Sequence, residues 1–317
     1  MIIRETLMLD SAGPRTLEDA AAGRGRSVRI LAHLFLPDKA SSAPAVVVSH
    51  GLAGPKPVRE LAYGCWLAEQ GHVALVLDSY GGRGMSNRSD GVRALMVTEA
   101  MLLADAFAGL DALRRLPMVD PARIGLMGFS YGGMVTLLAA YEQIASVFRG
   151  EGPGFAAHVS FYGCSIPRLD DPGTTGAPAL ILVGANDANV SLTRTRLIAG
   201  DLGRGGSPVE LHVLPEAFHQ WDGADLTPRR KIPSLRPLAL RVDDWYRTHG
   251  PAGLRMTGIS SRMLMMLLGV DLRGYVIKRD DLMRARTDRL TRRFLHRSLG
   301  AAGARTPARA LPDDRPP

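Results

Sequence analysis

One serine in this sequence stands in a pattern that is typical of a catalytic nucleophile. Residues 124–133 read IGLMGFSYGG, which places Ser130 between Gly128 and Gly132 in a Gly-x-Ser-x-Gly arrangement. In this pattern a sharp strand-to-helix turn strains the serine backbone, and its neighbours two residues away must be small. The turn exposes the hydroxyl, and the N-terminus of the following helix favours developing negative charge. Ser130 is therefore the candidate nucleophile; the alternative is a glycine-rich turn with an incidental serine.

A serine hydroxyl is a weak nucleophile until a neighbouring base takes its proton. The sequence contains eight histidines, of which His219 follows the apolar run VELHVLP in the segment LPEAFHQWDG. A loop after a strand would place His219 at the carboxyl edge of a sheet. His158 and His212 lie at the start of one predicted strand and inside another, where packed or edge histidines are common. The sequence therefore predicts His219 as the base.

The acid of such a site orients the imidazole and stabilises its charged form. Asp187 follows the apolar run ALILVG, in the segment VGANDANV. The chain order of nucleophile, acid and base is then the one found in enzymes whose nucleophile lies on such a turn. Asp170 and Asp171 are rival acids from a neighbouring loop. Asp222 is too close to His219 in sequence to be a good partner.

Acyl transfer also needs two backbone N–H donors aimed at the oxyanion of the tetrahedral intermediate. Tyr131, the residue after the nucleophile, is predicted to supply one donor. The segment VVVSHGLAG follows an early strand, and Leu52 is its expected donor, since Gly51 and Gly54 allow close approach of the backbone. His50 is interpreted as a residue that braces this loop.

Arg83, in the segment DSYGGRG, is a candidate for attracting an anionic substrate at the mouth of the site. The alternative is a loop arginine that donates to backbone carbonyls. The same glycine-rich stretch lacks the Lys-Ser/Thr of a phosphate-binding loop.

The elements that must position these residues alternate along the chain. Short apolar runs predict strands at 28–36, 45–50, 73–78, 124–129, 158–163, 179–186 and 209–215. The residues between these runs predict helices at 58–70, 91–116, 131–142, 191–202 and 235–248. Continuously apolar strands that alternate with helices indicate an α/β fold with a mostly parallel sheet covered on both faces. Catalytic groups of such sheets lie at the carboxyl ends of the strands.

The charge of the chain is unevenly distributed. Residues 251–317 hold 14 Lys/Arg against 6 Asp/Glu, whereas residues 1–250 hold 25 of each. We therefore predict a neutral catalytic domain over 1–250 and a basic C-terminal extension over 251–317, helical at about 280–299 and disordered at its end. This extension is either a solvated arginine-rich segment or a surface that docks on anionic partners.

Two cysteines, Cys65 and Cys164, are too few for a disulfide framework and are predicted to be buried free thiols. The N-terminus lacks the pattern of a secretory signal, and no apolar run is long enough to cross a bilayer. We therefore expect a cytoplasmic protein.

Taken together, HGLAG, LDSYGGRG, DPARIGLMGFSYGG, VGANDANV and LPEAFHQWD resemble the dienelactone hydrolase family of α/β-hydrolases over about residues 25–250. The resemblance implies an eight-stranded, mostly parallel core, no metal or organic cofactor, and small ester or lactone substrates. The chain has Ser130 where dienelactone hydrolase proper has cysteine. It also has His50-Gly51 where that enzyme has a glutamate, so it is similar to the serine-bearing branch.

The predicted function is hydrolysis of carboxylic esters or lactones by Ser130, His219 and Asp187 through an acyl-enzyme. A peptidase or amide hydrolase and an acyltransferase are alternatives on the same fold. A non-catalytic binding module is the alternative from another class. Nucleic acid is not expected as a partner, and the sequence does not predict the oligomeric state.

Overall fold

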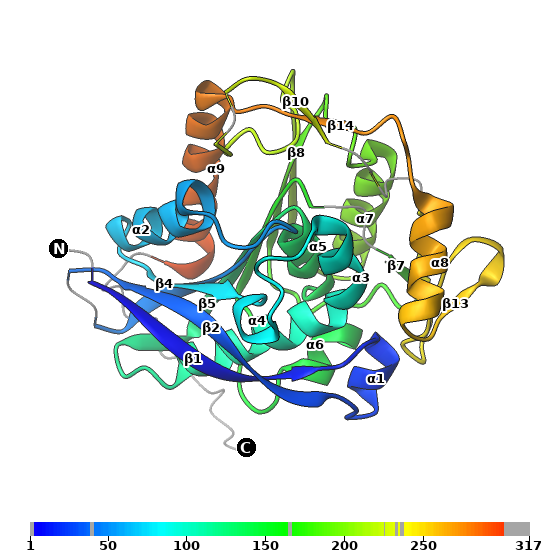
Figure 1. Ribbon diagram of the computed structural model, residues 1–317. Coiled ribbons are helices and arrows are strands. Elements are labelled where there is room, and N and C mark those ends of the chain that lie inside the picture. Colours follow the sequence, from blue (N-terminus) through cyan, green and yellow to red (C-terminus); the bar gives the residue numbers. More distant parts are fainter. Residues whose placement is uncertain are drawn as a thin grey trace, which may run out of the picture.

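The computed structural model describes residues 3–38, 41–163, 167–224, 226–231, 234 and 238–300. Its centre is an eight-stranded sheet with the strand order β1-β2-β4-β3-β5-β6-β8-β9 (Figure 1). The strands are β1 (Ile3–Gly13), β2 (Arg26–Leu36), β3 (Ala43–Ser49), β4 (Val73–Asp78), β5 (Val119–Phe129), β6 (Ala157–Phe161), β8 (Ala179–Gly184) and β9 (Val209–Leu214). Strands β1 and β2 are antiparallel to their neighbours, and the other neighbouring strands are parallel. The predicted mostly parallel sheet is confirmed.

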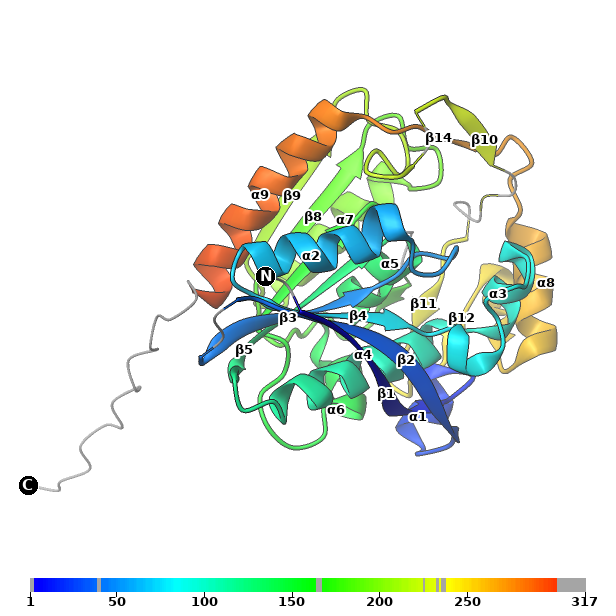
Figure 2. The ribbon, with the colours of Figure 1, turned by 60° about the vertical axis from the view of Figure 1, so that its left-hand side comes forward.

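Helices cover both faces of this sheet, as Figure 2 shows. Side chains of α2 (Ala62–Glu69) and α9 (Asp281–Leu299) belong to the apolar core on one face. The core on the other face includes side chains of four further helices, α4 (Glu99–Arg114), α5 (Tyr131–Leu138), α6 (Glu142–Phe148) and α7 (Leu192–Arg204). Because both faces are covered, strand β3 is buried along its whole length, which explains its continuous apolar sequence.

Smaller elements lie around the carboxyl edge of the sheet. They are α1 (Leu17–Ala21), a π-helical turn (Pro57–Leu61), 3₁₀ turns (Gly81–Arg83 and Pro251–Gly253), α3 (Asp90–Met96), α8 (Ile259–Gly269), β7 (Arg168–Leu169), β10 (Arg229–Lys231), β11 (Arg241–Val242), β12 (Thr248–His249), β13 (Arg255–Met256) and β14 (Tyr275–Ile277). Strands β13, β12, β11 and β7 form one small sheet, and β10 pairs with β14.

The single helix predicted over 91–116 is wrong, because α3 and α4 are separate. Val97 has an extended backbone, and the hydroxyl of Thr98 accepts a hydrogen bond from the backbone N–H of Met101. Threonine in this position caps a helix N-terminus, so a new helix begins there. The helix predicted over 131–142 is shorter than expected, because α5 ends at Leu138 and a separate helix, α6, begins at Glu142.

The helix predicted over 235–248 is wrong for the residues from 238 onward, which contain β11 and β12. The cause is a turn at Asp243, whose carboxylate accepts hydrogen bonds from the backbone N–H groups of Trp245 and Arg247. Aspartate competes for backbone donors in this way and favours turns over helix interiors.

Residues after 250 pack against the rest of the molecule. Helix α9 contacts β5, β6 and β8, and Phe294 is 1% exposed in the core it shares with α2. The Tyr63 hydroxyl donates to the carboxylate of Asp288 at 2.7 Å. No helix in the described ranges is both long and apolar enough to span a bilayer. Cys65 is a partly buried free thiol, whereas Cys164 and residues 301–317 lie outside the described residues.

We expect Phe294→Ala to lower the free energy of unfolding by about 3–5 kcal/mol, the usual cost of removing a buried phenylalanine ring. Leu282, on the same helix, is 85% exposed, so Leu282→Ala is the matched control and is expected to change stability by less than about 0.5 kcal/mol. Urea unfolding monitored by circular dichroism measures both. Equal stability of the two variants would contradict the packing of α9.

Candidate active site

Ser130 lies at the turn between β5 and α5 with the strained backbone that its motif predicts. Its φ is 51° and its ψ is −109°. A Cβ atom on Gly128 would lie 2.1 Å from the carbonyl oxygen of Gly132. A Cβ atom on Gly132 would lie 2.2 Å from the carbonyl oxygen of Ser49. Both positions therefore require glycine, and the turn directs the serine side chain away from the strand.

The structure brings Ser130, Asp187 and His219 together from the ends of three strands. The Oγ atom of Ser130 lies 3.0 Å from Nε2 of His219. Nδ1 of the same imidazole lies 2.7 Å from Oδ2 of Asp187. Because a carboxylate only accepts hydrogen bonds, Nδ1 carries the proton and Nε2 is left to accept the serine hydroxyl. All three side chains are buried.

Two tyrosines that were not predicted from the sequence pack against His219. The ring of Tyr162 lies 4.8 Å from the imidazole and the ring of Tyr275 lies 5.0 Å from it, both edge-on. The backbone N–H of Lys278 donates to the His219 carbonyl at 3.3 Å. Tyr162 directly follows β6, and this position at the carboxyl end of a strand could have indicated that it lies near the site. Tyr275 could not be found in this way, because it lies on the short strand β14 and does not follow a strand of the central sheet.

The rival carboxylates have other partners. The Tyr162 hydroxyl donates to Asp222 at 2.5 Å, and burial raises the pKa of Asp222 against the opposing effect of Arg59. Asp170 pairs with Arg241, and Asp171 accepts a hydrogen bond from a backbone N–H two residues on. Asp187 is thus the carboxylate that contacts His219.

The two predicted oxyanion donors, Leu52 and Tyr131, line the cavity beside Ser130. Tyr131 begins α5, and the first N–H groups of a helix have no partner within it. His50 braces the other loop, because its Nδ1 lies 2.7 Å from the Gly51 carbonyl and its Nε2 accepts from Ser79 N–H at 3.2 Å. Burial lowers the pKa of His50, so the ring is neutral, as these two bonds require.

Arg83 lies away from this cavity and is not among the described residues that line it. Its guanidinium donates to both carboxylate oxygens of the buried Asp105, at 2.6 and 2.9 Å, and to the carbonyls of Ser79 and Ala12. These bonds tie the segment after β4 to α4 and β1.

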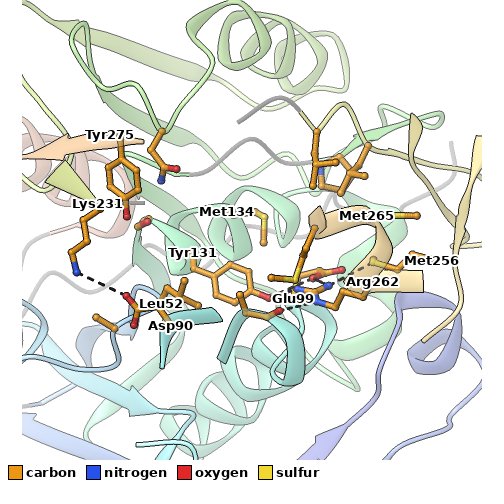
Figure 3. Close-up of a pocket in the computed structure, with 18 of the residues that line it drawn as sticks. Leu52, Asp90, Glu99, Tyr131, Met134, Lys231, Met256, Arg262, Met265 and Tyr275 are labelled. Atoms are coloured by element: carbon orange, nitrogen blue, oxygen red, sulfur yellow. Dashed lines mark hydrogen bonds and ion pairs between the residues drawn. The ribbon is translucent and has the colours of Figure 1, made fainter. Parts of the chain in front are cut away.

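The cavity has a volume of about 190 Å³. Figure 3 shows Tyr131 and Met134 between the Tyr275 side and the Arg262 side of the cavity. Its lining includes Met256, Arg262 and Met265, which follow residue 250. The sequence did not predict these residues as part of the site, because only the folding of the chain brings them near Ser130.

The sheet order, the parallel strands and the helices on both faces define an α/β-hydrolase fold. The sequence profile described as "Dienelactone hydrolase family" matches residues 30–225. The chain belongs to the dienelactone hydrolase family.

Two named relatives and one solved structure match the chain. A Methylorubrum extorquens protein named "Putative carboxymethylenebutenolidase" is 24% identical over 59% of this chain and 66% of its own length. The "Polyketide transferase af380" of Aspergillus fumigatus is 33% identical over 31% of this chain and 32% of its own. The chain thus spans about two thirds of the length of the first relative and about a third of the length of the second. The solved structure "m3DLH" is 17% identical, covers 93% of this chain and 98% of its own, and superposes with a TM-score of 0.56, which shows a shared fold.

Proposed function

We propose that this chain is a serine hydrolase that cleaves carboxylic esters or lactones, with Ser130 as nucleophile, His219 as base and Asp187 as the acid that orients it. The observation that carries the proposal is the continuous pair of contacts, 3.0 Å from Ser130 Oγ to His219 Nε2 and 2.7 Å from His219 Nδ1 to Asp187 Oδ2. Both distances lie within the range for proton transfer to a general base.

The reaction begins when Ser130 Oγ attacks the ester carbonyl carbon and His219 Nε2 takes its proton. The carbonyl electron pair moves to oxygen, and the N–H groups of Leu52 and Tyr131 hold this oxyanion. The intermediate collapses, the ester C–O bond breaks, and His219 protonates the leaving alcohol. Water then gives a proton to His219 and attacks the acyl-enzyme, which releases the acid and restores Ser130.

Transfer of the acyl group to an alcohol is the second candidate. It is favoured by the similarity to the fungal polyketide transferase. It uses the same acyl-enzyme with an alcohol in place of water. Product partition between acid and new ester, with and without added alcohol, distinguishes the two reactions.

A fluorophosphonate probe tests the proposal, since it reacts preferentially with a serine activated by a neighbouring base. We expect stoichiometric labelling at Ser130 in the native protein and none after heat denaturation, as read by peptide mass spectrometry. Ser160 is an internal comparison, because its hydroxyl donates to the Gly133 carbonyl at 3.0 Å inside the core. A label on another serine would count against the assignment.

A further inference from the structure

The wall of the cavity beside Ser130 is rich in thioether and aliphatic side chains. Besides Leu52, its members include four methionines and two further leucines, namely Met134, Met256, Met265, Met266, Leu238 and Leu240. We propose that this cavity binds the acyl part of the substrate, and that this part is a neutral, apolar chain or ring of about six to eight carbons. The inference rests on the proposed function and names its substrate class.

The size of the cavity indicates which acyl groups it can enclose. An apolar cavity of about 150 Å³ accommodates benzene, a six-carbon ring. The present cavity, at about 190 Å³, is somewhat larger. Methionine is flexible and polarisable, so a wall of this composition adapts to chains that differ by a methylene or two. The acyl group remains bonded to Ser130 in the acyl-enzyme, whereas the alcohol must leave. The acyl group is therefore the part that the cavity holds.

The charges that border the cavity are already paired. The guanidinium of Arg262 lies 2.8 Å from a carboxylate oxygen of Glu99 and donates to the Tyr131 hydroxyl at 3.0 Å. Its Nε donates to the Ala94 carbonyl at 2.8 Å. Burial opposes a charged Arg262, but Glu99 and Tyr131 raise its pKa above the ordinary value, so the ion pair persists. Lys231 lies 3.9 Å from Asp90, and Figure 3 shows this pair at the other side of the cavity.

A carboxylate on the substrate would therefore meet no unneutralised cation among the described lining residues. It would lose its hydration and face the carboxylate of Glu99, which is costly for a buried charge. The cavity thus selects neutral acyl groups.

Much of this wall comes from outside the family match. Met256, Met265 and Met266 follow residue 225, where that match ends. Met256 lies on β13, whereas Met265 and Met266 lie on α8, which Arg262 ties to Tyr131 and Glu99. The segment after residue 250 therefore contributes to acyl specificity, together with Met134, Leu238 and Leu240.

A series of p-nitrophenyl esters from acetate to dodecanoate tests the inference. We expect kcat/KM to peak at hexanoate or octanoate, at least about 10-fold above acetate, since each methylene bound in an apolar pocket raises transition-state binding. The mono-p-nitrophenyl ester of suberic acid has the length of octanoate with a terminal carboxylate, and we expect it to react at least about 100-fold more slowly. An optimum at acetate, or equal rates for the octanoyl and suberyl esters, would overturn the inference.

Met134→Trp fills the cavity, so we expect the octanoate-to-acetate ratio of kcat/KM to fall about 10-fold. Met266→Trp is the second variant if the first does not fold, and Leu282→Ala, on the exposed face of α9, should leave the ratio unchanged. Fluorophosphonate labelling separates the possible failures. Labelling with turnover but without this chain-length profile rejects the acyl-site inference, whereas absence of both labelling and turnover rejects the proposed function.

Discussion

Ser130→Ala is expected to lower kcat on a p-nitrophenyl ester by at least about 1,000-fold, because no other serine or cysteine nucleophile among the described residues contacts His219. The variant keeps the Gly128 and Gly132 turn, and alanine fits the same backbone without new contacts. The donors at Leu52 and Tyr131 also remain, so a residual rate above that in water is expected. Steady-state kinetics at saturating ester measures the loss, and KM should change little.

Ser146→Ala is the matched control for this experiment. Ser146 is an exposed serine on α6 whose hydroxyl donates to the Gln143 carbonyl, so its loss should leave kcat within about twofold of the parent, as for most surface substitutions. Unchanged circular dichroism of both variants would show that folding is not the cause. Turnover by Ser130→Ala at the level of Ser146→Ala would remove the nucleophile hypothesis.

The sheet and the three central side chains were predictable because each depends on local sequence and on one rule of topology. Ser130, Asp187 and His219 each follow an apolar strand, and the carboxyl ends of parallel strands meet at one edge. The glycines of the turn are required by contacts with backbone atoms, so their spacing carries a structural meaning even in one sequence.

The rest of the cavity was not predictable in this way. Arg262 and Met265 reach Ser130 because α8 packs beside α3, and nothing in their local sequence indicates that contact. The mistaken helices have a similar origin. Helical spacing of apolar residues continues past Thr98, yet its hydroxyl begins a new helix, and Asp243 makes a turn where the sequence pattern favoured a helix.

Asp187→Asn is expected to lower kcat by about 1,000- to 10,000-fold, the size of effect seen when the acid of such a triad becomes an amide. Oδ2 of Asp187 accepts the Nδ1 proton of His219, and Oδ1 accepts the backbone N–H of Asn189 at 2.9 Å. If the amide oxygen keeps the bond to Asn189, the amide nitrogen faces His219 and donates to Nδ1. The imidazole then carries its proton on Nε2 and cannot accept one from Ser130.

This prediction separates an orienting acid from a merely structural carboxylate. The folded state and KM should be nearly unchanged, while kcat and the rate of fluorophosphonate labelling at Ser130 fall together, because both need the same free Nε2. Asp170→Asn changes a carboxylate of the neighbouring loop that pairs with Arg241, and it should leave both rates intact. A fall in both rates for Asp170→Asn, with Asp187→Asn fully active, would transfer the role of the acid to the neighbouring loop.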